Sequence, residues 1–122
     1  MRTRHFILIA LVALLGSCYY DHEGILYPET ANCTAVATPL FTADVMPILD
    51  GRCNNCHAGS FASANIRLDN YQDVVTYVND GSLMGSIRHA GSFSPMPKNS
   101  SKLSACEIDK IQNWINAGSL NN

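Results

Sequence analysis

The stretch GRCNNCHAG, residues 51–59, contains two cysteines three positions apart, and a histidine directly follows the second cysteine. This pattern is compatible with a redox-active dithiol, with part of a zinc site, or with the covalent attachment of a haem group. Each of these chemistries needs a different structural context. The rest of the chain must therefore decide which of them applies.

The apolar residues around this motif recur at helical spacing. The sequence predicts helices over residues 42–50, 70–81, 82–90 and 104–118. Residues 92–102 are rich in Ser and Pro and predict an irregular loop. We find no sustained strand-type alternation and no internal repeat, so we expect an all-α fold.

Polar residues and glycines mark the expected helix ends. Thr42 and Asn70 are good N-caps, and Ser104 and Glu107 have the spacing of a capping box. The Asp50–Gly51 pair predicts an interruption just before the motif. The expected C-terminal stops are Gly81, Gly91 and Gly118.

The N-terminal segment has the pattern of an export signal. Arg2 and Arg4 precede an apolar run over residues 6–15, which is shorter than the ~20 residues that a membrane-spanning helix needs. The stretch LGSC, ending at Cys18, resembles a bacterial lipobox, and this resemblance implies cleavage before Cys18 and acylation of its thiol. A plain signal peptide with an incidental cysteine is the alternative.

These features divide the chain into a signal peptide (residues 1–17), a membrane tether (18–40) and one folded domain (41–122). Removal of the signal peptide changes the formal net charge from −2 to −4. A mildly acidic domain without a basic block gives no support for nucleic-acid binding. We expect an exported lipoprotein, anchored to a membrane and facing the periplasm or the cell surface.

Export also bears on the cysteines, because disulfides persist in an oxidising compartment. Cys18 is assigned to the lipid, and Cys53 and Cys56 belong to the motif. Cys33 and Cys106 then have no other role, and we expect them to form a disulfide. Two separate buried thiols are the alternative.

Haem attachment is the reading that accounts for every element of the motif. A zinc site needs about four ligands, and Cys53, Cys56 and His57 provide three at most. A redox dithiol needs a thioredoxin-like context, which the helical pattern lacks. Two thiols one helical turn apart can attach one haem group, and the adjacent His57 can bind its iron.

The segments DVMPILDGRCNNCH, LDNYQDVV, GSLMGSIRHAG, SPMPK and LSACEIDKIQNWINAGSLNN resemble the monohaem class I c-type cytochrome domains of bacterial lipoproteins. The resemblance covers residues 41–122. It implies a small helical domain around one haem c per chain, with the first and last helices crossing near Trp114. It also implies a distal methionine ligand in the loop before the last helix, which is the position of Met96.

The residues around Met96 agree with this role. Pro95 and Pro97 restrict the backbone on both sides of Met96, and a stiff loop can hold a thioether against iron at a low entropic cost. His89 is the main rival for the sixth position, and Met84 and Met46 are weaker ones.

Two charged residues near the motif and the Met96 loop, Arg52 and Lys98, are candidate partners of the haem propionates. Solvated surface charges are the alternative explanation for both.

The function predicted from these features is electron transfer by a non-enzymatic carrier. Its partners would be redox proteins at a membrane surface, and it would act as a monomer or as a subunit of a redox complex. A haem protein with a labile sixth site, either peroxidase-like or gas-binding, is an alternative. A structural lipoprotein without haem, stabilised by disulfides, is another.

Overall fold

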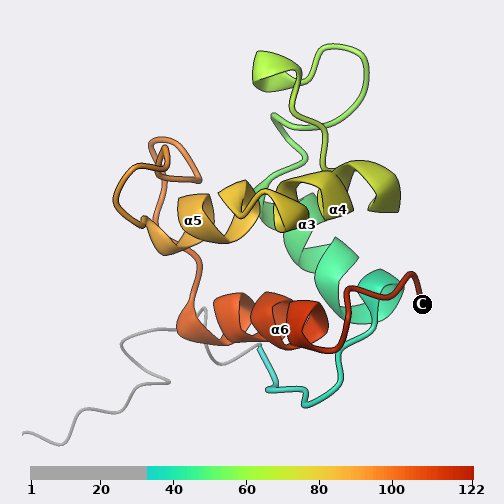
Figure 1. Cartoon of the computed structure of the whole chain (residues 1–122). Helices are drawn as coiled ribbons and strands as arrows, with labels where there is room; N and C mark the ends of the chain where they lie inside the picture. The colour runs from blue at the N-terminus through green and yellow to red at the C-terminus, as the bar shows by residue number, and fades with distance from the viewer. Residues whose placement is uncertain (1–32) are drawn as a thin grey trace, which may run out of the picture.

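The computed structural model describes residues 33–122 (Figure 1). Within this range the chain is helical and has no β-strand, so the all-α prediction is confirmed. The elements are η1 (Phe41–Val45), α3 (Met46–Arg52), η2 (Ser63–Asn65), α4 (Tyr71–Asn79), α5 (Ser82–Arg88) and α6 (Ala105–Asn116).

Some predictions fall on residues that the structure does not describe. The signal peptide, the first part of the tether and Cys18 lie outside residues 33–122. In the described part of the chain, no helix is long and apolar enough to cross a membrane.

The first helical segment differs from the prediction at both ends. It starts as a π-helix, in which the Val45 amide donates to the carbonyl oxygen of Leu40 at 3.2 Å. Thr42 is not the N-cap, because the Asp44 carboxylate accepts the Leu40 amide and the Thr42 hydroxyl donates to the carbonyl oxygen of Asn122. The predicted interruption at Asp50–Gly51 is also wrong, because α3 continues to Arg52.

The second and third helices follow local sequence signals more closely. Asn70 caps α4 by accepting the Asp73 amide at 3.0 Å, as expected. Gly81 has a φ of 77° and separates α4 from α5. The predicted stop at Gly91 is wrong: α5 ends at Arg88, because His89 adopts the left-handed conformation with a φ of 58°.

Helix α6 is the longest element and begins with the predicted capping box. The Glu107 amide donates to Ser104 Oγ, and the Glu107 carboxylate accepts the Ser104 amide. After Gly118 the C-terminal tail folds back, and the Trp114 indole N–H donates to the carbonyl oxygen of Leu120 at 2.9 Å. The tail thereby joins the start of η1 to the end of α6.

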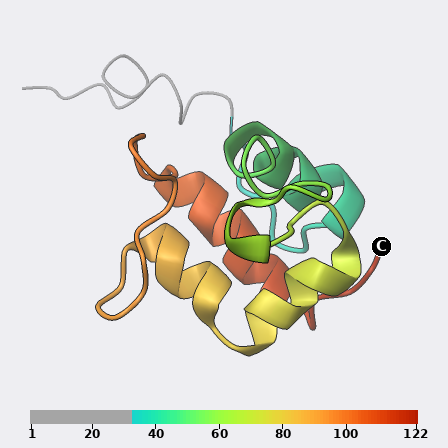
Figure 2. The same ribbon diagram turned by 90° about the horizontal axis from the view of Figure 1, so that it is seen from above.

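The hydrophobic core lies between these helices. Helix α6 contacts both η1 and α5, and in the view from above η1–α3 and α5 lie on different sides of α6 (Figure 2). The rings of Phe41 and Trp114, whose centroids are 5.3 Å apart, connect η1 to α6, and Trp114 is fully buried. The remaining core residues are Val45, Leu49, Leu68, Val74, Leu83, Ile87, Leu103, Ile108 and Ile111.

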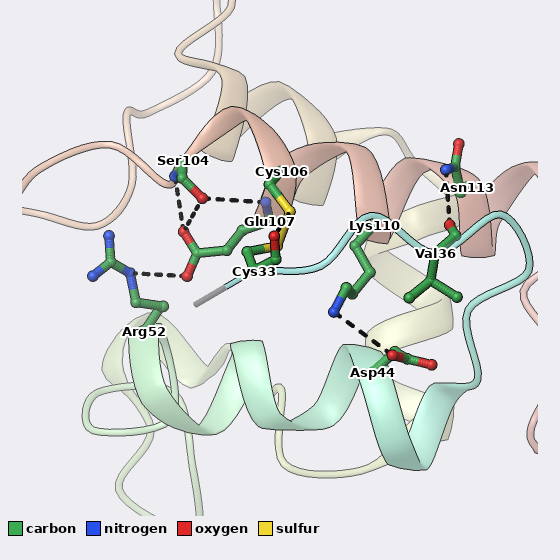
Figure 3. The surroundings of a disulfide bond; sticks show 9 residues. All are labelled: Cys33, Val36, Asp44, Arg52, Ser104, Cys106, Glu107, Lys110 and Asn113. Carbon is green, nitrogen blue, oxygen red and sulfur yellow. Dashed lines mark hydrogen bonds and ion pairs between the residues drawn. A yellow bond between two sulfur atoms is a disulfide. The ribbon is translucent and has the colours of Figure 1, made fainter. Parts of the chain in front are cut away.

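A disulfide between Cys33 and Cys106 attaches the N-terminal end of the described chain to the first turn of α6 (Figure 3). The two residues are 73 positions apart in sequence, and their Cα atoms are 6.0 Å apart. Nearby, Asn113 Nδ2 donates to the carbonyl oxygen of Val36. The segment that leads into the domain is thus held against α6.

Candidate functional site: a cavity lined by the CNNCH motif and Met96

A cavity of about 330 Å³ lies between α5, the loop that follows α3 and the loop that precedes α6. In Figure 1 these two loops extend beyond the α-helices. Apolar side chains make up much of the wall, while several serines contribute polar groups. The apolar lining residues include Ala64, Ile66, Leu68, Tyr77, Leu83, Ile87 and Pro97, and the serines are Ser63, Ser82, Ser86 and Ser94.

All three chemical groups of the motif line this cavity. The amides of Cys56 and His57 both donate to the carbonyl oxygen of Cys53 at 3.0 Å, which forms a tight turn at the end of α3. Both cysteines have free thiols, and Cys56 is exposed whereas Cys53 is half-buried. The turn therefore presents two thiols and an imidazole to one space.

Burial makes the two thiols chemically unequal. Cys53 packs against the hydrophobic core, and the loss of solvation raises the pKa of its thiol from 9.0 to about 11. The nearby Arg52 opposes this rise in pKa, and Glu107 adds to it. The Cys53 thiol consequently stays protonated at neutral pH.

His57 is buried, with 8% of its surface exposed, and is held from two sides. Its Nδ1 atom lies 3.1 Å from the carbonyl oxygen of Ile66, and its own carbonyl oxygen accepts the Leu68 amide at 2.7 Å. A carbonyl oxygen can only accept, so Nδ1 carries the proton in this hydrogen bond. In the neutral ring Nε2 then keeps its lone pair, which is the state that can bind a metal.

Met96 is half-buried and also lines the cavity, although 39 positions separate it from His57 in the sequence. Its amide donates to the carbonyl oxygen of Ser86 in α5 at 3.1 Å. The structure therefore brings the predicted distal residue to the same cavity as the motif.

The rivals of Met96 have other surroundings. His89 is exposed and does not line the cavity, and its Nε2 atom lies 2.9 Å from the carbonyl oxygen of Met96. Met84 and Met46 pack against the hydrophobic core. Among the residues that the structure describes, Met96 is the methionine that lines the cavity.

The two candidate propionate partners, Arg52 and Lys98, line the cavity as well. Arg52 is also linked to α6, with its Nε atom 3.7 Å from Glu107 Oε1 (Figure 3). Lys98 is exposed.

Sequence reasoning did not identify the carbonyl group of Ile66 or the serines of the cavity wall. A backbone carbonyl has no signature in residue type, and its role depends on which side chain folds against it. Tyr77 packs against the hydrophobic core and also lines the cavity.

The residues at this site fit a covalently attached haem. The site combines two thiols, an imidazole whose Nδ1 is occupied by a hydrogen bond, and a thioether around a largely apolar cavity. Within residues 33–122, no three His, Cys, Asp or Glu side chains are grouped so that they could hold a metal ion by themselves.

Comparisons with protein-family models, with curated proteins and with solved structures find no match to this chain.

Proposed function

We propose that this chain is a c-type cytochrome domain that carries single electrons. The observation that carries the proposal is that Cys53, Cys56, His57 and Met96 line one apolar cavity. The first three are neighbours in sequence, but Met96 reaches the cavity only through the fold. A thioether at the same cavity as a CNNCH motif supplies the sixth ligand that such a carrier needs.

In this proposal each residue has a defined role. The thiols of Cys53 and Cys56 would hold the haem through thioether bonds, and His57 Nε2 and Met96 Sδ would be the protein ligands of its iron. Held by these four residues, the haem would supply one-electron redox chemistry, and no position on its iron would be left open for a substrate. The largely apolar wall suits a group as apolar as a haem ring, and the hydrogen bond from His57 Nδ1 to the carbonyl oxygen of Ile66 orients the imidazole.

The location of the domain is part of the same proposal. The Cys33–Cys106 disulfide is the kind of bond that persists outside the cytoplasm, where bacterial c-type haem is attached. A lipid on Cys18 would restrict the domain to a membrane surface and to redox partners there. We propose that it acts as a monomer or as a subunit of a redox complex.

One observation favours a labile sixth site as a second candidate. The loop that carries Met96 is largely exposed, with residues 92–95 and 98–102 at the surface. Displacement of Met96 would open the iron to a small ligand, as in a gas-binding or peroxidase-like protein. The non-haem alternative needs a disulfide between Cys53 and Cys56, whereas the structure leaves both thiols free.

The test is an absorption spectrum of the mature chain produced together with haem-attachment machinery. We expect sharp α and β bands after reduction with dithionite, and a weak far-red band of sulfur ligation in the ferric state. The matched control is the double variant Cys53→Ala/Cys56→Ala, which should lose its colour when purified under denaturing conditions. A colourless parent chain beside a coloured control cytochrome would refute the proposal.

A further inference from the structure

The exposed residue His89 contacts the backbone of Met96. His89 ends α5 in the left-handed conformation, with a φ of 58° and a ψ of 42°. In this position its Nε2 atom lies 2.9 Å from the carbonyl oxygen of Met96. Because a carbonyl oxygen can only accept, His89 Nε2–H is the donor.

The other polar group of the Met96 backbone is bound by the same helix. The Met96 amide donates to the carbonyl oxygen of Ser86 at 3.1 Å, and Ser86 lines the cavity. The last turn of α5 and its cap therefore bind both the N–H and the C=O of Met96. We call these two hydrogen bonds the Met96 clasp.

The packing of Phe93 on Gly85 supports the clasp. A Cβ atom at Gly85 would collide with the ring of Phe93, so this close contact requires glycine. Much of the rest of the loop is exposed, including residues 92–95 and 98–102. Few other contacts are thus available to hold Met96 at the cavity wall.

We propose that His89 is a positioning residue for Met96 and not a ligand. This inference rests on the proposed function. The clasp orders the backbone of Met96 before the thioether binds, so its loss lowers the fraction of molecules in which Met96 is ready to bind iron. An added ligand for the iron then competes more successfully with the thioether of Met96.

Two substitutions of His89 distinguish its positioning of Met96 from its role as the C-cap of α5. His89→Asn keeps a residue that tolerates the left-handed conformation, but its amide is one bond too short to replace Nε2. His89→Gln places an amide nitrogen three bonds from Cβ, as in histidine, and restores a donor. Arg88→Asn is the matched control, because it removes an exposed basic side chain from the same helix end.

The experiment titrates the ferric holoprotein with imidazole and follows the far-red band. We expect His89→Asn to bind imidazole about threefold to tenfold more tightly than the parent, as the loss of one hydrogen bond implies. The imidazole affinity of His89→Gln should return towards that of the parent. The affinity of Arg88→Asn should equal that of the parent. Hydrogen exchange of the Met96 amide should be faster in His89→Asn only.

The outcomes distinguish this inference from the proposed function. Equal imidazole affinities and equal Met96 exchange rates in the parent, His89→Asn and His89→Gln would overturn the positioning role and leave the cytochrome proposal intact. Absence of the far-red band in the parent and in Met96→Ala alike, with a changed ferric spectrum only in the His89 variants, would mean that His89 is the ligand and would also overturn it. A parent chain without covalent haem would refute the proposed function itself.

Discussion

His57 Nδ1 and the carbonyl oxygen of Ile66 lie 3.1 Å apart, on the wall of a cavity that both residues line. This contact assigns the proton of the neutral ring to Nδ1 and leaves Nε2 available to a metal. His89 has the opposite arrangement, since its Nε2 faces the carbonyl oxygen of Met96. The two histidines of the described domain are therefore chemically distinct before any cofactor binds.

This difference can be measured in the chain produced without haem. At alkaline pH, ¹⁵N chemical shifts should show His57 as the Nδ1–H tautomer and His89 as the Nε2–H tautomer. The two rings serve as controls for each other in one spectrum. If the rings of His57 and His89 had the same tautomer, the orientation of one of these rings in the structure would be wrong.

Replacement of Met96 should change the iron without unfolding the domain. We expect Met96→Ala to lose the far-red ferric band and to lower the reduction potential, because thioether ligation favours the ferrous state. Met84→Ala is the matched control, since Met84 packs against the hydrophobic core. It should keep the band and lose about 1–3 kcal/mol of unfolding free energy. A normal band in Met96→Ala would remove Met96 from the iron.

The Cys33–Cys106 disulfide should contribute to stability and not to the spectrum. It closes a loop whose ends are 73 positions apart, so the double variant Cys33→Ala/Cys106→Ala should lose about 2–4 kcal/mol of unfolding free energy. Urea titration of the oxidised parent and the double variant measures this loss. An unchanged midpoint, or free thiols detected at Cys33 and Cys106 in the non-reduced parent by mass spectrometry, would contradict the prediction.

Asp73 should make the domain sensitive to acid. Hydrogen bonds from Asn70, together with the contact to Arg67, lower the pKa of Asp73 in the folded state. Its stabilising effect is therefore complete above the unfolded pKa of about 3.9 and is lost as the pH falls through the lower folded pKa.

We expect Asn70→Ala and Arg67→Gln each to raise the pKa of Asp73, as followed by the NMR titration of its carboxyl carbon. Arg67→Gln keeps the N-cap of α4, so it measures the effect of the Arg67–Asp73 ion pair on this pKa without the effect of the cap. The capping loss in Asn70→Ala should lower stability at every pH. If neither variant moved the titration, the cause assigned to the shift would be wrong.

The two thiols of the motif should differ in reactivity when haem is absent. At pH 8, iodoacetamide should label the exposed Cys56 much faster than Cys53, whose burial raises its pKa to about 11. The folded state also holds the Cys53 proton more tightly, so stability should fall as the pH rises above 9.0. Tandem mass spectrometry of peptide 53–67 measures the labelling of each thiol. In urea, where the chain is unfolded, Cys53 and Cys56 should be labelled at equal rates, and this provides the control.

Sequence patterns predicted the helix ends that depend on near neighbours. Asn70 with Asp73 and Ser104 with Glu107 form caps over three residues, and both are present in the structure. Thr42 failed as a cap because Asn122, 80 positions away, binds its hydroxyl. A local pattern contains no information about such a partner.

The candidate site likewise combines features set by neighbouring residues with features set by distant segments. The sequence alone determined the motif of Cys53, Cys56 and His57, because their chemistry depends on a spacing of a few residues. Only the tertiary structure decided that Met96 lines the cavity and that His89 binds the Met96 backbone. Those relations depend on how the loop folds against α5, and packing between distant segments sets that arrangement.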